Sequence, residues 1–178
     1  MEGNGRAAEK PMKDMKLCEL SDASFRTVGS CHDLLHPEWE KIGDGRTVDF
    51  YRDILPLRLG QDTVASFSLC HALPRDPLVE AVEYHTSTEE AVLPLDGDIA
   101  MVFAPATPGG SVPFEKLKAY RIPRGTMVVL KAGAWHSGPY IVGSTAIHIL
   151  VALPERTYAN DCVVRELSAG ERMRITGL

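Results

Sequence analysis

Long apolar runs, paired cysteines and a basic stripe are all missing from this chain of 178 residues. No window holds the roughly 18 consecutive apolar residues that a membrane-spanning helix needs, and the first residues lack the apolar core of a signal peptide. Neither a membrane partner nor secretion is indicated. We therefore expect a cytoplasmic protein.

The cysteines and the charges exclude two further classes of protein. The 4 cysteines are far apart and form no close pair, so neither a zinc ribbon nor a redox dithiol is indicated, and we expect reduced thiols. The net charge of -5 is mild, and the cationic residues are scattered among acids. No nucleic-acid partner is expected, because such partners select a concentrated basic surface.

A long helical period is also missing from residue 64 onward, where short β-rich runs take its place. The runs, such as DIAMVFA, TMVVLK and STAIHILVAL, are separated by turn segments such as DGD, PATPGG and PRG. This pattern predicts an all-β barrel or sandwich. Residues 1–15 are polar and lack an apolar period, which predicts a disordered tail. We expect one domain over residues 16–178, with a short helix capped by Ser21 near its start.

The stretch EYHTSTEEAVLPLDGD, residues 83–98, places costly charged groups in what reads as strand. Glu83 and His85 are two residues apart and should share one face of a strand. Glu90 follows on the next strand, and we expect a hairpin to bring it opposite the first. Gly97 is expected to take a positive φ in the turn. Glu89 should point away from Glu90, as a solvated carboxylate.

The spacing of these residues resembles the cupin family. His85-x4-Glu90-x6-Gly97 fits the first cupin motif, and Gly125-x5-Lys131-x-Gly133-x2-His136 fits the second. Glu83 stands where the first histidine of the motif is usual, Lys131 replaces a proline, and Tyr140 stands at the place of a final asparagine. The resemblance implies a cupin-type double-stranded β-helix, which is a jelly-roll barrel.

A closer likeness is to the ureidoglycolate lyase family, which is formed of cupins that produce glyoxylate and urea. The similar segments include LSDASFRTVG, EYHTSTEEAVLPLDG, FEKLKAYRI, GAWH and NDC, which together span most of the chain. Three positions depart from this family: His71 replaces an arginine, Leu130 a tyrosine and Ser137 a histidine. An arginine fork would be the natural clamp for a substrate carboxylate.

A closed barrel could bring His85, Glu90 and His136 together as metal ligands. Two imidazoles and a carboxylate suit a divalent transition metal such as Ni, Mn, Fe or Zn. A metal-free, hydrogen-bonded polar pocket is the alternative. Glu83 is predicted as the general base or as a fourth ligand, with an exposed strand-end glutamate as the alternative. His136 is predicted to act in catalysis as well as in metal binding.

Three further residues are candidates for contacts with the substrate. His71 stands at the position of the missing arginine, His148 lies among apolar neighbours, and Lys131 could reach an anion at the barrel mouth. Each has a plainer alternative, a hydrogen-bonded histidine or a solvated lysine. Tyr84 and Trp135 are predicted to be packing residues.

These observations lead to three functional hypotheses. The first is an enzyme of the ureidoglycolate lyase type, which cleaves ureidoglycolate or a related small hydroxy acid to glyoxylate and urea. The second is another cupin enzyme of small acids or sugar acids, an isomerase or a dioxygenase. The third is a non-catalytic cupin that binds a small carboxylate or sugar. A homodimer is expected, with His32, His36 and Trp39 as candidates for its edge.

Overall fold

The computed structural model describes residues 12–178, and it consists almost entirely of strands. The strands are β1 (Lys13–Glu19), β2 (Gly29–Asp33), β3 (Lys41–Gly43), β4 (Asp49–Tyr51), β5 (Ala65–Ala72), β6 (Leu78–Val79), β7 (Ala81–Tyr84), β8 (Glu90–Pro94), β9 (Ile99–Ala104), β10 (Lys118–Ile122), β11 (Thr126–Leu130), β12 (Trp135–Ile141), β13 (Ile147–Pro154), β14 (Val163–Glu166) and β15 (Met173–Thr176). The helices are α1 (Asp22–Phe25), α2 (Thr157–Asn160) and the 3-10 turn η1 (Pro108–Gly110).

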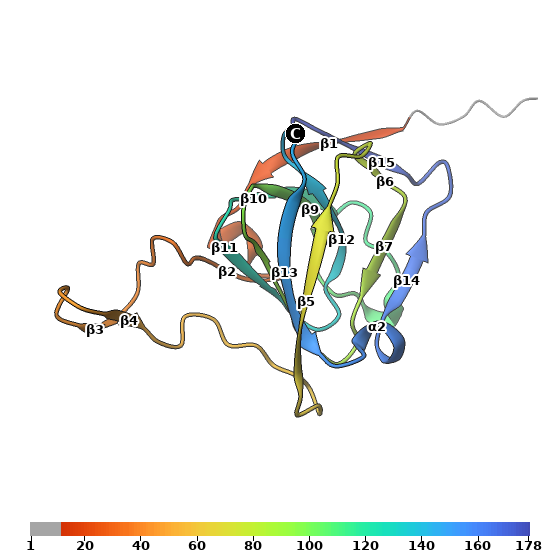
Figure 1. Cartoon of the computed structure of the whole chain (residues 1–178). Helices are drawn as coiled ribbons and strands as arrows, with labels where there is room; N and C mark the ends of the chain where they lie inside the picture. Colours follow the sequence, from red (N-terminus) through yellow and green to blue (C-terminus); the bar gives the residue numbers. More distant parts are fainter. Residues whose placement is uncertain (1–11) are drawn as a thin grey trace, which may run out of the picture.

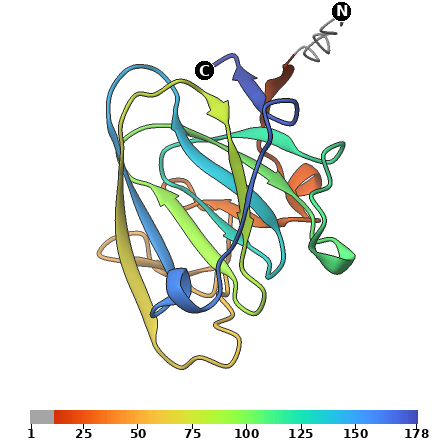
Figure 2. The same cartoon turned by 90° about the vertical axis from the view of Figure 1, so that its right-hand side faces the viewer.

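Two sheets curl around a common interior (Figures 1 and 2). The larger sheet has the strand order β14-β7-β12-β9-β10-β1-β15-β6, and the smaller has the order β2-β11-β8-β13-β5. From β7 onward the chain passes repeatedly from one sheet to the other, and most pairs are antiparallel. This layout confirms the predicted all-β jelly-roll.

The interior is filled by apolar side chains that both sheets contribute. Phe103 and Ile122 come from the larger sheet, while Leu130 and Ile149 come from the smaller one, and all four are at most 2% exposed. Burying one such side chain stabilises the fold by about 1.5–3 kcal/mol. The shared apolar interior therefore holds the two sheets together. Residues on strands that face each other across it can contribute to one site.

The short N-terminal helix forms where the sequence predicts it. The side chain of Ser21 accepts a hydrogen bond from the Ser24 amide and caps α1. Phe25 is fully buried, and its ring meets that of Phe103 edge-on, with centroids 5.1 Å apart. A Cβ at Gly29 would lie 2.0 Å from the carbonyl oxygen of Val129, so glycine is required for β2 to pair closely with β11.

The tail and the turn near Gly97 differ from expectation. β1 begins at Lys13, where it pairs with β15, so residues 13–15 belong to the sheet. Residues 1–11 lie outside the described residues, and the predicted tail is untested there. Gly97 has no positive φ. A Cβ at this position would lie 2.8 Å from the Ile147 side chain, so close packing is the constraint.

The expected hairpin between residues 83–85 and Glu90 is also wrong. β7 pairs with β12 and β14, whereas β8 pairs with β11 and β13 in the other sheet. Residues 86–89 therefore cross from one sheet to the other. Glu90 faces the end of β7 across the interior, because it shares one face of β8 with Val92, which belongs to the interior cluster.

A two-stranded arm made of β3 and β4 stands away from the two sheets (Figure 1). Ile42 and Phe50 on this arm are 51% and 58% exposed.

In the part of the chain that the structure describes, no helix has the length and apolarity that crossing a bilayer requires.

Candidate metal centre

His85, Glu90 and His136 converge in the interior as predicted. One ligand atom from each lies within 4.8 Å of the others, and the three residues are 3%, 7% and 3% exposed. His85 follows β7 and His136 lies on β12, so both imidazoles come from the larger sheet, while Glu90 comes from β8 of the smaller one. Glu90 Oε2 lies 3.2 Å from His85 Nε2 and 3.1 Å from His136 Nε2.

Backbone carbonyls orient both imidazoles. His85 Nδ1 lies 2.6 Å from the Asp161 carbonyl oxygen, and His136 Nδ1 lies 3.1 Å from that of Ala134. A carbonyl only accepts hydrogen bonds, so in each ring Nδ1 carries the proton and donates it. The Nε2 atoms of both rings are thereby directed at Glu90. This is the arrangement in which histidines bind metals in proteins.

The three groups together require a positive charge. A neutral imidazole with a protonated Nδ1 presents a lone pair at Nε2, and Glu90 presents another acceptor. His136 Nε2 is buried. Oxygens of Glu90 and Glu83 lie 3.1 Å and 3.4 Å away, but no atom in residues 12–178 forms a hydrogen bond of good geometry with it. A buried ring nitrogen facing carboxylate oxygens is costly unless a proton or a cation lies between them. A divalent metal between two Nε2 atoms and a carboxylate oxygen meets this requirement.

The pKa values express the same requirement. Burial disfavours the charged imidazole of His136, but the carboxylates of Glu83 and Glu90 outweigh burial and raise its pKa to about 10. The pKa of His85 is raised as well, since its contact with Glu90 overcomes burial. Burial opposes the charge of Glu90, yet the two imidazoles lower its pKa to about 2. Glu90 is thus a carboxylate at neutral pH, ready to neutralise a cation.

Glu83 lies beside this group but nearer the surface. Its Oε1 is 3.4 Å from His136 Nε2, and its side chain is 34% exposed. Contact with His136 lowers the pKa of Glu83, so it is ionised at neutral pH. Its Oε2 accepts a hydrogen bond from the thiol of Cys162 at 3.2 Å. Burial and this bond raise the pKa of Cys162 to about 12, which keeps it a thiol donor.

The turn before β12 connects the two cupin-like motifs. The amide of Gly133 donates to the carbonyl oxygen of His85 at 2.6 Å. Gly133 has a φ of +79°, and a Cβ there would lie 2.9 Å from the Cβ of Ala106. Glycine therefore allows this turn to reach the first motif and to place His136 beside His85.

Asp161 fastens the loop that follows His85. Its carboxylate accepts hydrogen bonds from the amide and hydroxyl of both Thr86 and Ser87, at 2.5–2.9 Å. Its carbonyl is the oxygen that orients His85. The segment 160–162 therefore orients two residues of the site. The Asp161 carbonyl orients His85, and the Cys162 thiol binds Glu83. In the sequence, NDC belongs to the segments of the family resemblance, and no pattern gives its residues a role.

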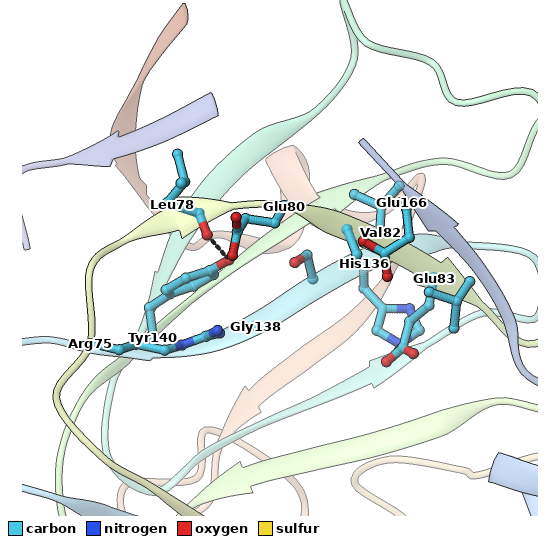
Figure 3. Close-up of a pocket in the computed structure, with 12 residues that line it drawn as sticks. Arg75, Leu78, Glu80, Val82, Glu83, His136, Gly138, Tyr140 and Glu166 are labelled. Atoms are coloured by element: carbon cyan, nitrogen blue, oxygen red, sulfur yellow. Dashed lines mark hydrogen bonds and ion pairs between the residues drawn. The ribbon is translucent and has the colours of Figure 1, made fainter. Parts of the chain in front are cut away.

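A cavity of about 350 Å³ opens beside Glu83 and His136 (Figure 3). Its other lining residues include Arg75, Glu80, Tyr140 and Glu166. Glu83 and His136 lie together toward one side of the view, and Arg75 and Tyr140 toward the other. The cavity gives a small molecule access to the outer edge of the candidate metal centre.

The three residues predicted to contact the substrate lie outside this site. His71 and His148 stack on each other on neighbouring strands, with centroids 4.6 Å apart, and both are exposed. His148 alternates with the interior residues Ile147 and Ile149, so it points outward, where Asp96 binds it at 2.6 Å. Lys131 is exposed and donates to the Arg26 carbonyl at 2.5 Å. These positions correct the expectation that the three line the site.

Two other expectations have mixed outcomes. Tyr84 and Trp135 pack together with ring centroids 4.5 Å apart, as predicted. Glu89, expected to be solvated, is 8% exposed, and its carboxylate accepts from the Arg58 amide and guanidinium at 2.8 Å and 3.0 Å. The strand alternation that turns Glu89 away from Glu90 holds. What covers Glu89 is the segment around Arg58, which no periodicity could predict.

Comparisons with known proteins leave the family open. No protein-family model and no curated protein match the chain. Among solved structures, a Bacillus subtilis oxalate decarboxylase studied for its Mn(II) centres is 13% identical, with a TM-score of 0.42 over 71% of this chain and 35% of that one. A dTDP sugar isomerase from Desulfovibrio desulfuricans is 14% identical, with a TM-score of 0.45 over 80% of this chain and 87% of that one.

A further match is an oxalate decarboxylase from Lactobacillus farciminis, 15% identical with a TM-score of 0.39, over 49% of this chain and 23% of that one. The chain thus spans well under half the length of the decarboxylases it matches. All these TM-scores are below 0.5, so the likenesses do not extend to the chemistry of the site.

Proposed function

We propose that this protein is a metal-dependent cupin enzyme that acts on a small hydroxy acid, by the reaction of the ureidoglycolate lyases. The buried, orphaned Nε2 of His136, which faces the same oxygen of Glu90 as His85 does, carries the proposal for the site. The resemblance of the segments around Glu83, Trp135 and Cys162 to that family supports the substrate class.

His85, Glu90 and His136 are the residues that would hold the ion. Mixed nitrogen and oxygen donors suit Mn, Fe, Ni or Zn. When bound, a divalent metal supplies positive charge that stabilises a developing alkoxide. Three protein donors would leave room for substrate oxygens, as in catalytic rather than structural metal sites.

Glu83 is the residue that moves the proton. It is ionised at neutral pH, and it lines the cavity where the substrate would lie. In the proposed reaction Glu83 takes the proton of the carbinol hydroxyl, and that carbon–oxygen bond becomes a carbonyl. The carbon–nitrogen bond breaks with its electron pair on nitrogen, which takes the proton back from Glu83. Glyoxylate and urea form without an oxidant or a reductant.

Cys162 positions Glu83 for this role. Its thiol donates to Oε2 and leaves Oε1 toward His136 and the cavity. Glu83 is outside the group whose ligand atoms all lie within 4.8 Å of one another, so the geometry supports the base role over a fourth ligand.

The test is direct turnover. Metal-stripped protein is incubated with ureidoglycolate alone and with added Ni, Mn, Fe or Zn, and urea and glyoxylate are followed. The proposal expects equal release of both products with at least one metal and none after chelation. The His148→Ala variant, altered on the outer face, is the control and should retain activity. Absence of turnover with every metal overturns the lyase assignment.

A further inference from the structure

An arginine that neither motif contains lines the cavity away from the metal centre. Arg75 lies between β5 and β6, and it borders the same cavity as Glu83 and His136. Figure 3 shows Arg75 beside Tyr140, with Gly138 and the course of β12 between this pair and His136. The cavity therefore has two chemically different ends.

Two contacts hold the Arg75 guanidinium in place. Its Cζ lies 4.2 Å from the centroid of the Tyr140 ring, and its Nη2 donates to the Pro139 carbonyl at 3.1 Å. The platform is itself fixed, because Tyr140 is 2% exposed and its hydroxyl donates to the Leu78 carbonyl at 3.1 Å. A guanidinium stacked on an aromatic ring is preorganised, so binding a ligand orders little further.

The charge of Arg75 has no partner of its own. No carboxylate in residues 12–178 forms an ion pair with it, although Glu80 and Glu166 line the same cavity. Glu80 is engaged by Arg172, whose Nη1 lies 2.9 Å from its Oε1. A guanidinium has five N–H donors, and the Pro139 carbonyl uses only one of its nitrogens. The remaining donors suit a carboxylate, which guanidinium binds through two parallel hydrogen bonds.

We propose that Arg75, on its Tyr140 platform, is a subsite for a carboxylate at the far end of the substrate, opposite the end that reacts. The inference rests on the proposed function for the reacting end, and it makes the preferred substrate a related hydroxy acid with a second acidic group, since ureidoglycolate has only one carboxylate. His136 and Tyr140 are four residues apart on β12, which is bulged between Ser137 and Tyr140. At about 3.3 Å per residue of extended strand, the two ends are separated by at most about 13 Å, so the substrate carries a spacer between its acidic ends.

Binding of a graded ligand series tests this. Isothermal titration of metal-loaded protein uses the 2-hydroxy diacids of five, six and seven carbons, and for each the 2-hydroxy monoacid of equal chain length. We expect the best diacid to bind about 10- to 100-fold tighter than its monoacid, as for a hydrogen-bonded ion pair. Arg75→Ala should abolish that preference and leave the affinity for monoacids unchanged.

The controls separate the subsite from general charge and from folding. Arg52→Ala removes the same charge on the β3–β4 arm and should keep the preference for diacids. Arg75→Lys retains the charge but not the planar guanidinium, so it should keep only part of the preference for diacids. If Arg75→Ala does not fold, this variant tests the subsite in its place. Equal affinity for diacids and monoacids, or a preference that survives in Arg75→Ala, overturns the subsite.

The two proposals fail differently. Ureidoglycolate turnover does not require Arg75, so turnover without any diacid preference would remove the subsite alone. A diacid preference that depends on Arg75, in a protein without lyase activity, would leave the subsite and remove the proposed reaction.

Discussion

Glu83 lies on β7 and His85 directly follows that strand, but the two residues have different surroundings. His85 is 3% exposed and oriented by a backbone carbonyl, whereas the Glu83 side chain is 34% exposed and borders the cavity. A buried, oriented imidazole suits a ligand, and a reachable carboxylate suits a base. The difference comes from depth in the barrel, which the two-residue spacing does not reveal.

Replacing Glu83 by glutamine separates the two roles. The amide keeps the shape of the side chain but cannot accept the carbinol proton, so we expect kcat to fall by about 10²- to 10⁴-fold. Metal content should stay at the wild-type level by elemental analysis. Glu80→Gln is the matched control, since it makes the same change in the same cavity and should retain activity. Loss of the metal in Glu83→Gln would instead make Glu83 a ligand.

Single residues also show how far the sequence predicts the site. The proximity of Glu83, His85, Glu90 and His136 could be predicted because motif spacing and strand alternation are local properties, while their roles stay predictions. His148 was misplaced because β13 carries apolar residues on both faces, so its pattern does not say which face is interior. His71 was misplaced because on β5 it shares the exposed face with the large apolar residues Phe67 and Leu69. Arg75 and Cys162 carry no periodic signal, and only the folded chain brings them to the cavity and to Glu83.

Connections between elements were harder to predict than the elements. The short length of residues 86–89 favours a hairpin, but the segment crosses to the other sheet. Asp161 stabilises that crossing, because its carboxylate accepts four hydrogen bonds from Thr86 and Ser87. A crossing held by a residue some 75 positions later in the chain leaves no mark in the local sequence.

The hydrogen bonds from Thr86 and Ser87 to the Asp161 carboxylate, here called the clasp, predict that the stability of the fold depends on pH. Burial opposes the charge of Asp161, but the hydrogen bonds from Thr86 and Ser87 outweigh it and lower the pKa from 3.8 to about 2. A depressed pKa in the folded state means that the contribution is complete above about pH 4 and is lost as the pH falls toward 2. Asp161→Ala should lower the urea concentration at the midpoint of unfolding at pH 7. Between pH 4 and pH 2, the midpoint of this variant should decrease less than that of the wild type.

The control for the clasp is Asp62→Ala, which removes an exposed carboxylate without a side-chain hydrogen bond in the described residues. It should leave the urea midpoint near the wild-type value throughout this pH range. If the midpoint of Asp161→Ala falls with acid as steeply as that of the wild type, the clasp does not set the acid sensitivity.

At the scale of the whole molecule, the pattern of short β-rich runs and turns was sufficient to predict an all-β barrel or sandwich, and the cupin resemblance implied the jelly-roll. They could not predict the β3–β4 arm, whose strands pair only with each other. The homodimer stays a prediction. The exposed side chains of Phe67 and Leu69 on β5, 71% and 64% accessible, form an apolar strip on the outer face of an edge strand.

The candidate metal centre joins the two sheets, so metal should stabilise the entire fold. His85 and His136 belong to the larger sheet and Glu90 to the smaller one, and a bound ion would link them across the interior. A ligand that binds only the folded state adds about 4 kcal/mol at a free concentration of 1,000 times its Kd. For a chain of this length that corresponds to a rise in Tm of about 8–16 °C.

Thermal unfolding of metal-stripped protein with and without Mn, Ni, Fe or Zn measures this rise. Glu90→Gln removes the candidate ligand that comes from the smaller sheet, so its Tm should respond little to any metal. His148→Ala removes an imidazole from the outer face of the same sheet and should show the full rise. A Tm that no metal changes would mean that protons alone balance Glu90, since a high pKa of His136 also satisfies this buried carboxylate.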